Sequence, residues 1–190
     1  MIVYIRNMVC NRCKSAVQVI LENQGCHVQK IELGEVEIIE ESLSSDQLQT
    51  INTLLIDAGF ELIDDRKSRI IEKIKNTVIT LVHYSDDHPK GKQSELISKE
   101  LHYDYSYLSK LFSEIEGITI EQYIIHQKIE KVKEYLVYDE LNLNEIAYRM
   151  GYSSSAHLSA QFKKITGLPP GHFKNLGASQ RKSLDKTGAK

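Results

Sequence analysis

The chain has 190 residues, a formal net charge of −2 and 41% hydrophobic residues, a composition ordinary for one or two globular domains. The charge is unevenly divided: residues 1–88 carry 9 Lys and Arg against 14 Asp and Glu, whereas residues 89–190 carry 15 against 12. An acidic first part and a mildly basic second part fit a sensing region joined to a region that binds nucleic acid.

The three cysteines are too few, and odd in number, for a disulfide framework, so we expect reduced thiols. The first eight residues alternate in polarity and lack the apolar core of a signal peptide. No apolar stretch approaches the ~20 residues that span a bilayer. These features predict a cytoplasmic protein without a membrane partner.

Residues 1–65 predict the order β-α-β-β-α-β. Strands are expected at residues 2–5, 27–33, 35–39 and 60–63, and helices from Cys10 to about Gln24 and from Ser44 or Ser45 to Gly59. Gly25 ends the first helix, and Gly34 turns the hairpin between the middle strands. The order predicts a ferredoxin-like sandwich, with two helices on one face of an antiparallel sheet, within an α+β protein.

A third helix is expected from about Arg66 to Tyr84, capped by Asp64 or Asp65. It forms the linker, residues 66–85, and its apolar stripe comprises Ile70, Ile71, Ile74, Val78, Leu81 and Val82. The stripe favours packing on its own chain, with dimerisation as the alternative. After a polar hinge at residues 86–92, we expect a second domain over residues 90–174 and a disordered tail over residues 175–190.

Residues 94–173 contain one pattern twice, with an offset of fifty residues. The run Tyr107–Phe112 is echoed by His157–Phe162, and Gly117 by Gly167. Each run follows a short amphipathic helix and a polar turn, and it can be capped by Asp104 in the first copy and by Ser153 or Ser154 in the second. A short helix, a tight turn and a capped second helix are typical of the helix-turn-helix motif. An ordinary helical bundle is the alternative, and two matched copies favour DNA binding.

Each capped helix has an apolar face and a face of small polar residues. The apolar faces are expected to comprise Leu108, Leu111, Phe112 and Ile115 in the first copy, and Leu158, Phe162 and Ile165 in the second. Slim hydrogen-bonding residues on the other face suit a helix that enters the major groove. A long helix from Ile118 or Thr119 to Tyr138 would span roughly 27–30 Å, so it could hold both units over successive turns of DNA, roughly 34 Å apart.

These motifs resemble the DNA-binding domain of the AraC family of bacterial transcription regulators. The resemblance covers residues 97–173 and is most specific at residues 143–147, 151–153, 162–164, 167 and 169–173. It implies seven helices, two helix-turn-helix units and binding of double-stranded promoter DNA. RNA polymerase and a second copy of the chain are the further partners that it suggests.

The family's base-facing positions can be carried over residue by residue. They are Tyr105, Ser106, Ser109 and Lys110 in the first recognition helix, and Ser155, Ala156, His157 and Ala160 in the second. Family members often have Arg or Gln at such positions, and an alanine can touch a thymine methyl but cannot form a bidentate pair. The second unit is therefore expected to anchor the DNA backbone, with Lys163 and Lys164 as phosphate contacts.

A second resemblance covers residues 1–65. A strand, a loop containing Met8-x-Cys10-x-x-Cys13 and a helix resemble the heavy-metal-associated domain of copper chaperones and metal-pumping ATPases, although Asn7 replaces the usual Gly. The resemblance implies that Cys10 and Cys13 bind a soft metal ion. Two thiolates near a helix N-terminus suit Cu(I), whereas Zn(II) would need further ligands from Cys26, His27, a second subunit or water.

Two other roles stay open for this domain: dimerisation or sensing of another signal, and thiol redox chemistry. A thioredoxin-like enzyme is expected to have a proline near its later strands, yet the only prolines are Pro89, Pro169 and Pro170. No phosphate-binding glycine loop, Ser-His-Asp set or paired catalytic carboxylates stand out. We therefore predict a bacterial transcription regulator that is not an enzyme, with a metal-trafficking or thiol-exchange protein as the alternative.

Overall fold

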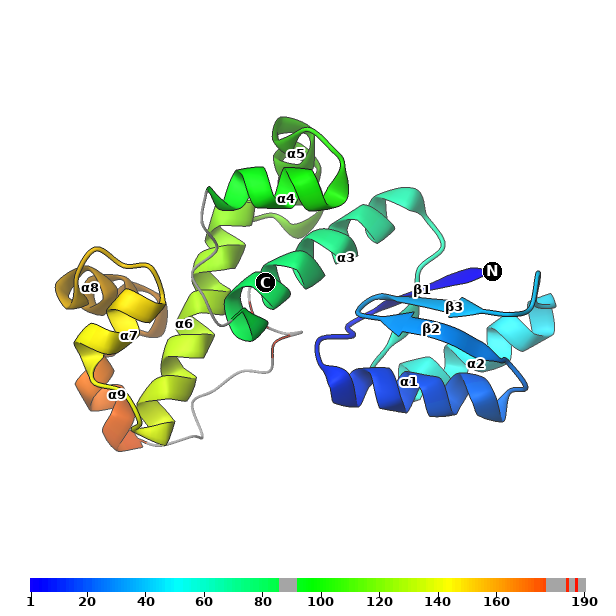
Figure 1. Ribbon diagram of the computed structural model, residues 1–190, viewed down its shortest axis with the longest axis horizontal. Helices are drawn as coiled ribbons and strands as arrows, with labels where there is room; N and C mark the ends of the chain where they lie inside the picture. The colour runs from blue at the N-terminus through cyan, green and yellow to red at the C-terminus, as the bar shows by residue number, and fades with distance from the viewer. Residues whose placement is uncertain (86–91, 177–183, 185–186, 188–190) are drawn as a thin grey trace. The chain divides into compact units, whose positions relative to one another are not determined.

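The structure is a computed structural model that describes residues 1–85, 92–176, 184 and 187. The chain divides into two compact units, Met1–Asn76 and Thr77–Lys190. Figure 1 labels their helices and strands. Within the described residues, none of the helices combines the length and apolar character that crossing a bilayer requires.

The first unit is built on a four-stranded sheet. Its strands are β1 (Ile2–Arg6), β2 (Val28–Glu32), β3 (Glu35–Ile38) and β4 (Glu61–Leu62), in the order β2-β3-β1-β4 with every neighbouring pair antiparallel. Helices α1 (Asn11–Asn23) and α2 (Ser45–Asp57) lie together on one face of the sheet (Figure 1). The β-α-β-β-α-β order expected from the sequence is present. The last strand is shorter than expected because the Phe60 N–H bonds back to the Leu55 carbonyl of α2 instead of joining the sheet.

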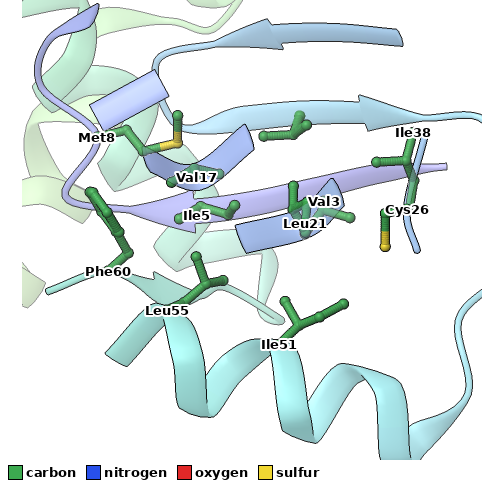
Figure 2. Close-up of a cluster of buried hydrophobic side chains, with 11 residues drawn as sticks. Val3, Ile5, Met8, Val17, Leu21, Cys26, Ile38, Ile51, Leu55 and Phe60 are labelled. Atoms are coloured by element: carbon green, nitrogen blue, oxygen red, sulfur yellow. The ribbon is translucent and has the colours of Figure 1, made fainter. Parts of the chain in front are cut away.

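The core of this unit lies between the sheet and the two helices. Val3 and Ile5 alternate along β1 and face Val17 and Leu21 of α1 (Figure 2). Ile51 and Leu55 of α2 complete the layer, and Met8, just after β1, is fully buried with them. The period of two along β1 thus places one face of the strand in the core, as a half-buried strand requires.

Helix α3 (Arg66–Ile79) continues into η1 (Thr80–Tyr84), a short π-helical turn. Asp65 provides the cap of α3, because its Oδ1 accepts the N–H of Ser68 at 2.8 Å. Its first turns contact the sheet of the first unit: the Arg69 guanidinium lies 4.5 Å from the centre of the Tyr4 ring, and Lys73 Nζ lies 2.9 Å from Glu35 Oε2. These two contacts agree with the prediction that this helix packs on its own chain.

The second unit is helical throughout its described residues. It contains α4 (Gln93–Leu101), α5 (Tyr105–Glu116), α6 (Ile120–Tyr138), α7 (Leu143–Arg149), α8 (Ser155–Thr166) and α9 (Pro170–Leu176). Thr119 caps α6 through a reciprocal pair of hydrogen bonds with Gln122. Helix α9 reaches Leu176, so it extends two residues into the expected tail. The rest of that tail, apart from residues 184 and 187, and residues 86–91 of the expected hinge lie outside the described residues.

Candidate nucleic-acid interface and cysteine site

Helix α5 follows α4 through a tight turn. His102 ends α4 with a φ of 57°, in the left-handed region, and Asp104 then caps α5 by accepting the backbone N–H of Ser106 at 2.8 Å. The hydrogen bonds from the Ser106 side chain and backbone hold the pKa of Asp104 below its usual value. The inner face of α5 buries Leu108, Leu111 and Phe112. The other face of α5 is thereby directed away from the core.

Helix α8 repeats this arrangement after α7. Of the two serines proposed as its cap, Ser154 has the role, because its Oγ accepts the N–H of His157 at 3.1 Å. Ser153 Oγ instead lies 3.1 Å from the Nδ1 atom of His157 and holds its ring on the outer side of α8. Leu158 and Phe162 are fully buried. Both copies of the motif therefore have a side-chain cap at the matched positions Asp104 and Ser154, and matched buried positions, Leu108 with Leu158 and Phe112 with Phe162.

A side chain of α6 contacts the turn of the second helix-turn-helix motif, which comprises α7 and α8. Lys128 Nζ donates to the Met150 carbonyl at 2.9 Å, at the end of α7, and lies 5.7 Å from the centre of the Tyr152 ring. Burial lowers the pKa of Lys128 and raises the pKa of Tyr152 to about 12. A lysine in a helix is usually a solvated residue, so this role of Lys128 was not predicted from the sequence.

A chain of polar side chains leads from η1 through α6 toward α5, the second helix of the first helix-turn-helix motif. Gln127, which is fully buried in α6, donates from Nε2 to the Tyr123 hydroxyl at 3.0 Å, and its Oε1 lies 3.0 Å from His83 Nε2 of η1. The Tyr123 ring packs against Phe112 of α5, with ring centres 5.5 Å apart. Burial lowers the pKa of His83, so its ring is neutral and its Nε2–H is the donor to Gln127. Through these contacts η1, α6 and the recognition helix α5 form one packed group.

The predicted base-facing residues lie on the outer sides of α5 and α8, with different degrees of exposure. The exposed ones are Ser106, Lys110, Ala156, His157 and Ala160, and the half-buried ones are Tyr105, Ser109 and Ser155. The Tyr105 hydroxyl donates to Glu121 Oε1 at 2.5 Å, and burial and this carboxylate raise its pKa. Tyr105 thus joins α5 to the start of α6, and its hydroxyl is already used within the chain.

One outward residue was missed by the sequence reasoning. Tyr107 is 45% exposed, stacks near Tyr103 with ring centres 5.7 Å apart, and matches His157 under the fifty-residue offset. Applying that offset to His157 would have identified it. The expected apolar faces were also too long: Ile115 and Ile165 are 47% and 39% exposed, because the last buried residues of their helices lie one turn earlier.

The two helix-turn-helix motifs differ in their balance of charged residues. Residues 93–116, which cover α4 and α5, contain two lysines and five carboxylates, whereas residues 143–166, which cover α7 and α8, contain three Lys and Arg and one carboxylate. Lys163 and Lys164 are exposed in the last turns of α8 and form no ion pair within the described part of the chain. The positive surface suited to phosphate contacts therefore lies on the second helix-turn-helix motif.

Comparisons with known proteins agree with the presence of helix-turn-helix motifs in the second compact unit. A family model described as "Helix-turn-helix domain" matches residues 97–175. The C-terminal domain of AraT, a response regulator from Geobacillus stearothermophilus, aligns with a TM-score of 0.50 and 26% identity, covering 63% of this chain and 95% of that one. Residues 97–175 therefore match a helix-turn-helix domain.

Curated relatives of the chain are named as regulators. An HTH-type transcriptional regulator of Bacillus subtilis, YtdP, is 26% identical over 162 residues, which cover 78% of this chain and 20% of that protein. The xylose operon regulatory protein of Escherichia coli K12 is 30% identical over 102 residues, which cover 53% of this chain and 26% of that protein. The chain thus spans about a fifth to a quarter of the lengths of these relatives.

The cysteine pair lies at the start of α1 in the first compact unit, whereas the helix-turn-helix match lies in the second. Cys10 is the residue before the helix and Cys13 lies in its first turn, with the two Sγ atoms 3.4 Å apart and both residues half-buried. Burial opposes ionisation of Cys10, but hydrogen bonds from Cys13 and Arg12 and the charge of Arg12 outweigh it and lower its pKa. Burial and the neighbouring Cys10 raise the pKa of Cys13. Cys10 is therefore the first of the two thiols to ionise.

The loop that carries the pair begins at a strained residue. Asn7 has a φ of 72°, in the left-handed region that glycine enters without penalty and that asparagine tolerates better than most residues. This conformation explains why asparagine can stand where the heavy-metal-associated pattern has glycine. The side-chain amide of Asn7 also donates to the Gly59 carbonyl at 3.1 Å, a bond that glycine could not make.

The ligands considered for Zn(II) are not gathered at this loop. Cys26 is buried in the core after the far end of α1, a helix of 13 residues that spans about 20 Å. His27 Nδ1 lies 2.7 Å from Glu40 Oε1, away from the cysteine loop. Over the residues that the structure describes, no cluster of three or more His, Cys, Asp or Glu is placed to hold a metal ion. The two thiols therefore suit a soft ion with few ligands better than a four-ligand zinc site.

Proposed function

We propose that this chain is a transcription regulator that binds promoter DNA through α5 and α8 of its AraC-type domain. The observation that carries the proposal is the pair of matched, capped helices, both packed against α6, with polar outer faces. The 19 residues of α6 span about 28 Å, which is comparable to the spacing of successive major grooves on one side of DNA. The regulator names of the two curated relatives support the same function.

The two helices would have unequal roles. On α5, the exposed Ser106, Tyr107 and Lys110 can hydrogen-bond to base edges. On α8, Ala156 and Ala160 offer only apolar contacts, whereas Lys163 and Lys164 can neutralise phosphates. The first helix-turn-helix motif would therefore read bases, and the second would provide most of the electrostatic binding. RNA polymerase and a second copy of the chain are the protein partners we propose, and a homodimer predicts a mass in solution of twice 21.7 kDa.

We also propose that the first unit is a ferredoxin-like domain of the heavy-metal-associated type that controls DNA binding. Its strand order, its two helices on one face and the thiol pair at the start of α1 support this assignment. Cys10 and Cys13 would hold a soft ion such as Cu(I), with Cys10 ionising first. The ion would act as a signal rather than in catalysis, and it would alter DNA affinity only if it binds the two states of the protein unequally.

DNA binding is tested by selection of the full chain against a library of random-sequence duplexes, followed by affinity measurements on the enriched site. We expect an enriched sequence with two parts about 10–10.5 base pairs apart. Lys110→Ala should relax the preference in one part, whereas Lys163→Ala should weaken binding to all sequences alike. Lys30→Ala, an exposed change in the other unit, is the matched control and should alter neither. A selection that enriches no sequence would refute the proposal.

A further inference from the structure

The entry to the cysteine loop is held by a side chain from the linker helix. The backbone N–H of Asn7 donates to Glu72 Oε1 of α3 at 2.8 Å. Asn7 stands three residues before Cys10, and the residue after it, Met8, is fixed in the core. The left-handed conformation of Asn7 is thus stabilised by a partner that is 65 residues away in the chain.

Loss of this hydrogen bond would destabilise the buried carboxylate of Glu72. Only 4% of its surface is exposed, and a buried carboxylate must be hydrogen-bonded to offset the loss of its hydration. If the backbone of Asn7 rotates, Glu72 loses one of its donors, and if α3 shifts, Asn7 loses the acceptor that stabilises its conformation. The shape of the loop entry and the position of α3 therefore depend on each other.

The same stretch of α3 also contacts the turn between β2 and β3. Asn76 packs so closely against Gly34 that a Cβ atom at this glycine would overlap the Asn76 side-chain amide. The Gly34 carbonyl in turn accepts the N–H of Ile5 at 3.0 Å, two residues before Asn7. One turn of α3 thus contacts two neighbouring points at the same end of the sheet. A change in the loop therefore acts on the packing of this turn.

We propose that Glu72 couples the state of the Cys10–Cys13 pair to the position of α3. The inference rests on the proposed function, in which a soft ion at the two thiols controls DNA binding. An ion that repositions the two sulfur atoms acts on a short loop whose entry is fixed by Glu72, so that the contact with α3 is strengthened or weakened. Helix α3 continues into η1, where His83 is bonded to Gln127 beside the first recognition helix.

The test compares three variants of the full chain. Glu72→Ala removes the acceptor, Glu72→Gln keeps an oxygen that can accept the Asn7 N–H, and Glu61→Ala is the matched control. Glu61 is an exposed carboxylate that pairs with Arg6, next to Asn7, at 3.1 Å. Each variant is measured for alkylation of Cys10 and Cys13 by iodoacetamide and for affinity to the selected DNA site with and without Cu(I). Glu72→Asp, which withdraws the acceptor but keeps the carboxylate, replaces the alanine variant if that variant does not fold.

We expect alkylation to be at least threefold faster in Glu72→Ala than in Glu61→Ala. The ratio of DNA affinities with and without Cu(I) should fall to near one in Glu72→Ala, while Glu72→Gln and Glu61→Ala keep the ratio of the unmodified chain. A ratio that survives in Glu72→Ala together with an unchanged alkylation rate would overturn the inference and leave the proposed function standing. An unmodified chain that binds Cu(I) with no change in DNA affinity would overturn both the proposed control and this inference.

Discussion

Replacement of His83 tests how the first recognition helix is held. His83 is the η1 end of the chain His83–Gln127–Tyr123, which reaches the Phe112 ring of α5. Burial keeps the pKa of His83 below its usual value, whereas the hydrogen bond that His83 donates to Gln127 opposes that shift. The neighbouring charges on α6 have mixed effects, because Lys131 lowers the pKa and Glu134 and Glu130 raise it. We therefore expect His83 to be neutral in the folded protein over the physiological range.

The sign of the resulting pH dependence follows from linkage. A histidine whose folded pKa lies below its unfolded value takes up a proton mainly when the protein unfolds, so stability is greatest above about pH 6.5 and falls as the pH drops through the folded pKa. In that range the slope for one group approaches about 1.4 kcal/mol per pH unit. At pH 7.5, loss of the hydrogen bond alone should reduce the free energy of unfolding by about 0.5–1.5 kcal/mol in His83→Ala.

The assay is urea unfolding of the full chain followed by circular dichroism between pH 5 and 7.5. The difference in unfolding free energy between the unmodified chain and His83→Ala should be positive at pH 7.5 and should shrink as the pH falls. His172→Ala, which removes an exposed histidine from α9, is the control and should leave the pH dependence unchanged. A difference that stays constant across this range would refute the assignment of His83 as a buried neutral residue.

Two further substitutions test the electrostatic and the packing arguments. Replacing both Lys163 and Lys164 with alanine should lower the slope of log affinity against log salt by about 2, because each phosphate contact on B-DNA contributes about 0.9; an unchanged slope would remove α8 from the phosphate contacts. Gly34→Ala should destabilise the chain by more than the roughly 1–2 kcal/mol expected for the left-handed backbone alone, because its Cβ meets the side chain of α3. Gly25→Ala, with a similar φ but open space around it, measures the backbone cost by itself, and equal losses in thermal unfolding would contradict the packing.

The sequence was sufficient where local chemistry and periodicity decide the structure. The fifty-residue repeat predicted the helices α5 and α8, and side-chain oxygens at Asp104 and in the Ser153–Ser154 pair marked where they begin. The strand and helix patterns of residues 1–65 likewise predicted the order of elements in the first unit. These features depend on residues close together in the chain, so their patterns can be recognised without a structure.

The sequence was insufficient where distant residues decide. A glutamine or lysine in α6 has the pattern of a solvated residue, yet Gln127 and Lys128 are bonded to η1 and to the end of α7. The departure at Asn7 was noticed, but its left-handed backbone and its bond to Glu72 depend on the fold. The apolar faces were extended to Ile115 and Ile165 because periodicity gives the direction of a side chain, not the length of the surface that covers it.

We propose that residues 97–175 bind specific DNA and that the thiol pair controls this binding. The most direct measurement is an anaerobic Cu(I) titration of the reduced chain on its selected duplex, beside Cys10→Ser/Cys13→Ser. We predict specific binding by both proteins, tight Cu(I) binding by the unmodified chain alone, and a change in its DNA affinity that the double variant lacks. Failure of both proteins to prefer the selected duplex over a shuffled one would contradict the regulator function, and an identical response of both to Cu(I) would contradict control by the cysteines.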